Sequence, residues 1–196
     1  MKQPKNLVLY LAILATLSMV LYAQFILGHY SECFRIENKV NSLGLSFGYS
    51  ARDVMTFFES RSKQQLNCYV EFLSKWDTIF PLLYTAMNSI WIIYLLKKRL
   101  FLIIIPLIQM LCDWTENYLE VSMVNNYLNS GLIPEDLISY GSSTTILKWT
   151  LSILTYTIIV TGIIIRFTFF LRRVLPKSNW GWNKKINSFK FSKLFL

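Results

Sequence analysis

Apolar residues in this chain are gathered into four long blocks. Leu7–Gly28, Thr78–Leu96 and Leu100–Cys112 contain no charged residue, and Leu151–Ile165 continues the same character. A helix needs about 20 mainly apolar residues to cross about 30 Å of hydrocarbon. The first block has that length, and the other three reach it once a few polar residues at one end are included. The pattern therefore predicts four membrane-spanning helices.

We expect an all-α integral membrane protein, a four-helix transmembrane bundle with a small helical extracytoplasmic cap. With 54% hydrophobic residues, a soluble fold of buried helices would have too little polar surface to be solvated. The bundle covers residues 1–173, and a basic, aromatic cytoplasmic tail covers 174–196. The spans are expected at about 7–28, 77–96, 100–120 and 146–171, with the outer cap at about 29–76.

Basic residues mark one side of the predicted membrane. The turn between the second and third spans is Lys97-Lys98-Arg99, whereas the turn-rich outer loop 125–143 has acidic residues and no Lys or Arg. Cytoplasmic loops carry an excess of Lys and Arg. Both termini are therefore predicted to be cytoplasmic, in a plasma or bacterial inner membrane. The net charge of +9 is then a signal of topology, and no nucleic-acid partner is predicted.

The tail after the fourth span mixes basic and aromatic side chains. Such a mixture favours an anionic membrane surface, so membrane lipids are the predicted partners. An RNA-binding tail has a similar composition and is the alternative. The predicted membrane-surface residues are Arg172, Arg173, Lys177, Trp180, Trp182, Lys184 and Lys185.

Local signals organise the outer segment. Ser50–Asp53 and Ser62–Gln65 each have the form of a capping box that opens a helix. The second of these helices should run into the second span, with Pro81 as a kink. Cys33 and Cys68 both fall in this segment, and they can form a disulfide if the outer compartment is oxidising.

Polar residues form a line on each of the last three predicted spans. On the third span, Gln109, Asp113 and Glu116 recur at i, i+4 and i+7, which is one face of a helix. Charges within hydrocarbon are costly and usually face the interior of a bundle. We therefore expect one shared interior pocket for a ligand or ion. Its predicted residues are Asp77, Tyr84, Asn88, Gln109, Asp113, Glu116, Asn117 and Lys148.

The depth of this site follows from the helical rise. Counting from the basic turn at about 1.5 Å per residue puts Asp113 roughly 20 Å across the membrane, in its outer half. Glu120 is then expected near the outer interface, and Lys148 enters from the outer side. Gln24 and His29 could join from the outer end of the first span.

Three interpretations of the polar site stay open. In the first, Lys148 pairs with Glu116 or Asp113, and the other groups hydrogen-bond across helices, each contributing about 1 kcal/mol or less. In the second, these groups line a pocket that opens to the outer face. In the third, the excess of carboxylates makes a proton or cation site, because crowded carboxylates should hold at least one proton at neutral pH.

The sequence favours a non-catalytic protein that binds a small amphiphile or lipid in this pocket. The alternatives are an accessory subunit of a larger membrane complex, with a membrane-protein partner, and a proton- or cation-conducting site. A subunit of a complex could present Thr150, Thr157 and Thr161 to its partner. No catalytic residue, cofactor or metal site is predicted, because the chain has no nucleophile motif, no phosphate loop and a single histidine.

Four short motifs suggest relatives. They are Gly48-Tyr49-Ser50, Asp77-x-x-Phe80-Pro81-x-x-Tyr84, Asp113-x-x-Glu116-Asn117 and Thr145-x-x-Lys148-Trp149. In these motifs the chain resembles a group of small four-span bacterial membrane proteins of unknown activity. The resemblance implies a four-helix architecture and a bacterial inner membrane, and it implies no activity. A looser analogy, at the level of the fold alone, is with four-span sterol-binding proteins of the emopamil-binding type.

Overall fold

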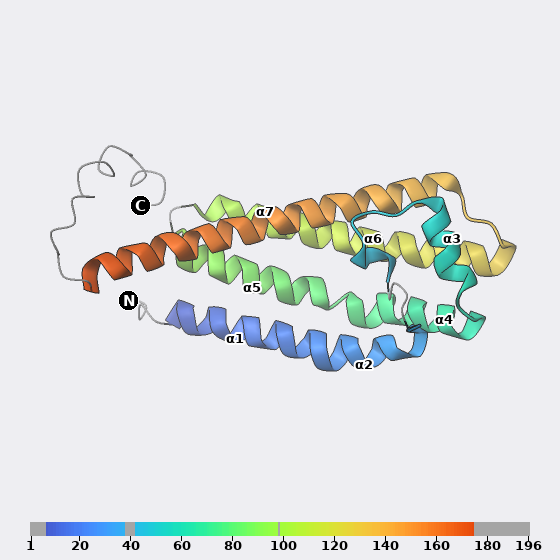
Figure 1. Cartoon of the computed structure of the whole chain (residues 1–196), viewed down its shortest axis with the longest axis horizontal. Helices are drawn as coiled ribbons and strands as arrows, with labels where there is room; N and C mark the ends of the chain where they lie inside the picture. Colours follow the sequence, from blue (N-terminus) through green and yellow to red (C-terminus); the bar gives the residue numbers. More distant parts are fainter. Residues whose placement is uncertain (1–6, 38–41, 98, 175–196) are drawn as a thin grey trace.

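Four long helical segments dominate the structure, a computed structural model that describes residues 7–37, 42–97 and 99–174. Each segment is long and apolar enough to cross a membrane. The segments are Leu7–Phe34, Lys63–Leu95, Leu100–Ser130 and Glu135–Leu171. They run side by side, so that α1 begins and α7 ends at the end of the molecule opposite the short helix α3 (Figure 1). We refer to these as the α3 end and the opposite end.

The first helical segment lies at the edge of the bundle. It comprises α1 (Leu7–Leu21), a π-helical stretch (Tyr22–Leu27) and the short α2 (Gly28–Ser31). α1 packs along α5 (Figure 1), where the Trp91 indole donates to the Thr16 hydroxyl at 3.0 Å. Ala12 is the one residue of α1 that is fully buried. Most of the apolar surface of α1 is therefore exposed, as a lipid-facing helix requires.

Two short helices form the α3 end, and both predicted capping boxes are confirmed. They open α3 (Ala51–Glu59) and α4 (Lys63–Glu71). In the first box the Ser50 backbone N–H donates to Asp53 at 2.8 Å, and the Asp53 N–H donates to the Ser50 hydroxyl at 3.3 Å. The Asp53 carboxylate also accepts from the Ser50 hydroxyl at 2.7 Å, and this bond, followed by the one from the Ser50 N–H, lowers the pKa of Asp53 and favours its charged form.

The passage from α4 to α5 (Phe80–Leu95) contains a π-helical stretch, Phe72–Asp77. Pro81 lies in the first turn of α5, where its missing N–H costs least. Just before Pro81, the backbone widens from an α-helix into the π-helical stretch. The Thr78 hydroxyl donates to the carbonyl of Leu73 in this stretch at 2.9 Å. The predicted irregularity at Pro81 is therefore present as a break in the α-helical pattern just ahead of it, and Asp77 lies at the end of the widened stretch.

The prediction of a turn-rich loop at 125–143 is wrong. α6 (Ile104–Ser130) and α7 (Glu135–Val174) are separated by only a short turn, which begins at Gly131 with φ of 70°. Both helices extend beyond the spans predicted at 100–120 and 146–171 at this end, while the membrane boundaries themselves stay a prediction. Burial of Met123, Val124 and other residues against α3 and α4 keeps these turns helical, so packing overrides the local turn signals.

A core of buried apolar residues lies at the α3 end. It joins α3 and α4 to the adjoining ends of α6 and α7, and a disulfide between Cys33 and Cys68, with Cα atoms 6.3 Å apart, fixes the end of the first segment to α4. Cys112 is a free, buried thiol. The core residues are Phe34, Leu43, Tyr49, Val54, Phe57, Phe58, Leu66, Tyr69, Phe72, Leu73, Met123, Val124 and Ile138.

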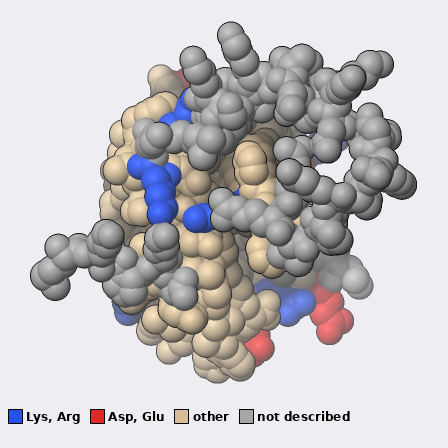
Figure 2. All heavy atoms as spheres, turned by 90° about the vertical axis from the view of Figure 1, so that its left-hand side faces the viewer, with Lys and Arg blue, Asp and Glu red and all other residues tan. Residues whose placement is uncertain are grey.

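The opposite end carries basic side chains. Lys97 and Arg99 lie between α5 and α6. Arg166 of α7 donates to the carbonyl of Tyr94 at 2.6 Å, and its guanidinium lies 4.0 Å from the centre of the Tyr94 ring. It therefore caps the C-terminal turn of α5 with a positive charge. Figure 2 views this end: among the residues coloured there, Lys and Arg lie on the face and Asp and Glu lie at its margin.

Candidate functional site

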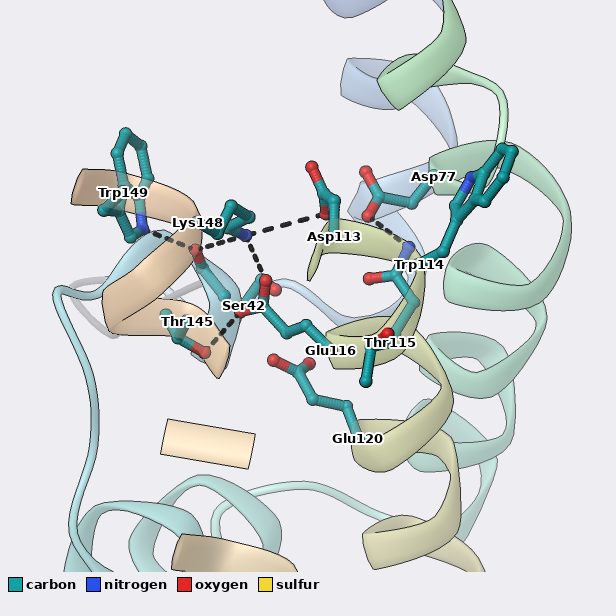
Figure 3. A network of polar contacts seen from close by, with 12 residues as sticks. Ser42, Asp77, Asp113, Trp114, Thr115, Glu116, Glu120, Thr145, Lys148 and Trp149 are labelled. Atoms are coloured by element: carbon teal, nitrogen blue, oxygen red, sulfur yellow. Dashed lines mark hydrogen bonds and ion pairs between the residues drawn. The ribbon is translucent and has the colours of Figure 1, made fainter. Parts of the chain in front are cut away.

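Four acidic side chains meet between the helices toward the α3 end (Figure 3). Asp113, Glu116 and Glu120 come from one face of α6, because their spacing of three and four residues places them on successive turns. They are 7%, 0% and 1% exposed. Asp77 joins them from the end of the π-helical stretch before α5. We call these four residues the carboxyl cluster.

Lys148 of α7 is the cation that the described part of the chain pairs with the carboxyl cluster. Its ammonium forms an ion pair with Glu116 and lies 3.6 Å from Asp113 Oδ1. The lysine side chain is 12% exposed. A buried ion pair of this kind is costly to break from one side, because the remaining charge is left without compensation.

Each carboxyl group also accepts a hydrogen bond from an uncharged donor. The donors come from α4, α5, α6 and α7, so every helix around the cluster contributes. Such donors can bind a carboxylate and can equally bind the carbonyl oxygen of a protonated acid. The bonds are Asn117 to Asp77 at 2.9 Å, Tyr84 to Asp113 at 3.0 Å, Thr145 to Glu116 at 2.6 Å, and Tyr69 to Glu120.

A short turn, Leu43–Leu45, closes the cluster toward the α3 end. The carbonyl of Gly44 accepts from Lys148 Nζ at 3.2 Å and from Trp149 Nε1 at 3.1 Å. A Cβ atom on Gly44 would lie 2.7 Å from Glu116 Oε1, so only glycine allows this approach. The hydroxyls of Ser42 and Tyr69 are 3.0 Å apart, which ties the turn to α4.

Three further polar residues lie deeper in the bundle. Asn88 and Thr155 are 0% exposed and Gln109 is 5% exposed. Both polar atoms of the Asn88 side chain, Gln109 Oε1 and Thr155 Oγ1 have no hydrogen-bond partner within the described residues. Ile92 and Ile159 are buried as well, at 0% and 7% exposure. The polar interior thus reaches inward from the carboxyl cluster.

The structure brings together six of the eight predicted pocket residues: Asp77, Tyr84, Asp113, Glu116, Asn117 and Lys148. Asn88 and Gln109 are buried, and in the described part of the chain no hydrogen bond joins their side chains to these six. Glu120, which was expected near the outer interface, is 1% exposed because the α3 end covers it, and its depth in a membrane stays a prediction. Gln24 and His29 are exposed and stay apart from the site.

Sequence reasoning missed the residues that close the site. Tyr69 lies on the apolar face of α4, where nothing distinguishes it from a core residue. Gly44 reads as a flexible position, and its contact with Lys148 joins residues 104 positions apart. Thr145 and Trp149 did carry a signal, because both belong to the motif that contains Lys148.

Part of the predicted membrane surface falls outside the part of the chain that the structure describes. Lys177, Trp180, Trp182, Lys184 and Lys185 lie outside the described residues, as do the side chains of Arg172 and Arg173. Among the residues that are described, no group of three or more His, Cys, Asp and Glu side chains is arranged to hold a metal ion.

Comparison of the chain with protein-family models, with curated proteins and with solved structures finds no match. A functional assignment therefore depends on the contacts of the carboxyl cluster.

Replacing Lys148 with Met should destabilise the protein by about 3–5 kcal/mol, because Glu116 would keep a buried charge without a partner. The measurement is the unfolding midpoint of the detergent-solubilised protein. In an Asp113→Asn, Glu116→Gln background the same replacement should cost much less.

Lys75→Met is the matched control. Lys75 pairs with Glu71 on an exposed surface, and the two side chains are 64% and 57% exposed, so its loss should change stability by about 0.5 kcal/mol or less. Equal effects of Lys148→Met and Lys75→Met would show that the buried pair is dispensable.

Proposed function

We propose that this chain is a non-catalytic, multi-pass membrane protein whose carboxyl cluster binds and releases protons in the outer half of the bilayer. Intramembrane carboxyl groups serve as proton sites in many pumps and transporters. The membrane setting is supported by four helices long and apolar enough to span, with much exposed apolar surface. The α3 end then forms an extracytoplasmic cap over the cluster.

One observation carries this proposal, namely the imbalance of charge. Asp77, Asp113, Glu116 and Glu120 gather around the single ammonium of Lys148. If all four were ionised, the bundle would bury three more negative charges than positive ones. Low-dielectric surroundings penalise like charges at this spacing, so neutral acids replace some carboxylates at neutral pH.

A purely structural role does not require so many acids. One carboxylate would neutralise Lys148, and amides such as Asn117 provide hydrogen bonds across helices without any charge. The uncharged donors to each carboxyl tolerate both protonation states, so protons can leave or arrive without rearrangement of the helices. A proton site therefore accounts for the composition of the cluster better than polar contacts alone.

The orientation follows from charge and redox chemistry. Lys97 and Arg99 at the opposite end fit a cytoplasmic side. The Cys33–Cys68 disulfide at the α3 end fits an oxidising compartment. We therefore place both termini in the cytoplasm and the α3 end outside, in a plasma or bacterial inner membrane.

A second candidate is binding of a small amphiphile or lipid. Two donors, Lys148 Nζ and Trp149 Nε1, converge on one oxygen, the carbonyl of Gly44. A hydroxyl, carbonyl or phosphate oxygen of a lipid could replace it if the Leu43–Leu45 turn moved aside. The accessory-subunit alternative gains less support, because exposed Thr150 and Thr157 already donate to carbonyls of their own helix at 2.8 Å and 2.7 Å.

Single cysteines should report the orientation. In a Cys112→Ser background, Leu132→Cys at the α6–α7 turn should react with an impermeant maleimide added outside intact cells. Lys97→Cys should react only after the cells are opened. Leu132 is 74% exposed and Lys97 is exposed, so both positions are accessible in the folded protein. The reverse pattern would contradict the proposed topology.

Protonated carboxyl groups should be visible at pH 7 in the infrared C=O stretch of the purified protein. Exposed Asp and Glu are ionised at this pH and contribute no such band. Asp113→Asn and Glu120→Gln should each remove part of the signal, whereas Glu135→Gln, at an exposed position, should leave it unchanged. A wild-type protein without this band at pH 7 would contradict the proposal.

Native mass spectrometry tests the second candidate. If the cluster binds an amphiphile, gently solubilised protein should carry an adduct that an Asp113→Asn, Glu116→Gln variant loses. A chain without an adduct, or one that carries another protein, would remove this candidate and leave the proton site unaffected.

A further inference from the structure

Three side chains form an unbroken series of hydrogen bonds between the start of the Leu43–Leu45 turn and the carboxyl cluster. The hydroxyl oxygens of Ser42 and Tyr69 are 3.0 Å apart, and the Tyr69 hydroxyl donates to Glu120 Oε2. Burial increases along the series, since Ser42 is half-buried, Tyr69 is 0% exposed and Glu120 is 1% exposed. The series therefore joins a partly accessible residue to an acid that the α3 end covers.

A count of protons gives the direction of these hydrogen bonds. A tyrosine hydroxyl has one proton to donate and two lone pairs that accept. When Glu120 is ionised, the Tyr69 proton points to it, so Ser42 must be the donor in its bond to Tyr69. The Leu43 N–H donates to the second lone pair of the same oxygen, at 3.4 Å. The side-chain bonds thus all point from Ser42 toward Glu120, and they can reverse when Glu120 is the acid.

The core of the α3 end holds the Tyr69 ring in place. The centre of the ring lies 4.9 Å from that of Phe34 and 5.1 Å from that of Phe57. The preceding residue, Cys68, is bonded to Cys33. These contacts keep the phenol oxygen between its two partners, so a proton can cross it without movement of a helix.

The other oxygen of Glu120 has no donor. Within the described residues, Glu120 Oε1 is buried and unpartnered. An unpartnered oxygen of a buried carboxylate costs more free energy than the unpartnered carbonyl oxygen of a neutral acid. The surroundings of Glu120 therefore favour uptake of a proton.

The charges near Glu120 act in the same direction. Glu116, one turn away on α6, and Asp77, before α5, oppose a further negative charge, whereas Lys148 of α7 favours one and is already paired with Glu116. The titratable and charged groups around the series are Tyr49, Arg61, Asp77, Glu116 and Lys148.

We propose that the hydroxyls of Ser42 and Tyr69 carry protons between water at the α3 end and Glu120. This inference rests on the proposed proton site and names its route of access. A hydronium ion gives a proton to the Ser42 oxygen, the Ser42 hydroxyl proton passes to the Tyr69 oxygen, and the Tyr69 proton passes to Glu120 Oε2. Both hydroxyls end neutral, Glu120 ends as the acid, and water remains outside. Release of a proton is the same series of transfers in reverse.

The experiment compares Ser42→Ala with Ser42→Thr in the full chain, because only the second variant keeps a hydroxyl. The readout is the part of the infrared C=O band that Glu120→Gln removes, followed after transfer into D₂O, where exchange of the acid proton shifts the band. Ser42→Ala should keep this band and slow its exchange by about 100-fold, the order of a lost proton-transfer group. Ser42→Thr should exchange at close to the wild-type rate.

Tyr69→Phe interrupts the series one step further in, and it should slow exchange by a similar factor. Tyr127→Phe is the matched control, since the Tyr127 ring packs in the same core, 5.3 Å from that of Phe58, outside the series. It should keep the wild-type rate. A weakened fold would speed exchange, so slower exchange separates a relay from a purely structural role.

Exchange at the wild-type rate in Ser42→Ala would overturn the relay and leave the proton site standing. Equal slowing in Ser42→Ala and Ser42→Thr would do the same, because the hydroxyl would then not be the cause. A wild-type protein without the band at pH 7 would overturn both the relay and the proton site.

Discussion

Burial of the Lys148 ammonium is the constraint on which the rest of this structure depends. An ion in low-dielectric surroundings costs several kcal/mol unless oxygen atoms replace its water. Glu116 and Asp113 supply those atoms from α6, which fixes the register of α6 against α7. The remaining oxygen comes from Gly44, in a turn far away in sequence. The Gly44 carbonyl thereby joins the Leu43–Leu45 turn to α7, in addition to the aromatic core and the disulfide of the α3 end.

The two halves of the molecule are consequently held together by different forces. At the α3 end, a dense aromatic core, a disulfide and the polar contacts of the cluster act together. At the opposite end, the helices are held together by close packing at small residues. A Cβ on Gly162 of α7 would lie 3.1 Å from Leu95 Cβ on α5. Such small-residue contacts are the usual means of packing where lipid competes for apolar surface. α1 stands apart from the cluster and contributes an exposed apolar edge to the bundle.

Local and periodic features of this fold could be predicted from the sequence. Ser50 and Ser62 each begin a capping box, a motif of four residues that can be recognised in the sequence. The line of polar residues on α6 follows from helical spacing alone. The complete burial of Glu120 could not be predicted, because the helical spacing of α6 does not show that the α3 end covers this residue. The full length of α6 and α7 could not be predicted either, because burial against α3 and α4 keeps their last and first turns helical. Closure by Gly44 and Tyr69 depends on tertiary contact, which periodicity does not encode.

The contact between Gly44 and Lys148 also dictates an order of assembly. A ribosome completes the first three spans, with Asp113 and Glu116 already inside them, before Lys148 and Trp149 exist. Until α7 inserts, the Leu43–Leu45 turn has no donor to bind and the acids have no cation. The Leu43–Leu45 turn can therefore reach its final contacts only once α7 is present, and a chain cut short before residue 148 leaves Asp113 and Glu116 without Lys148.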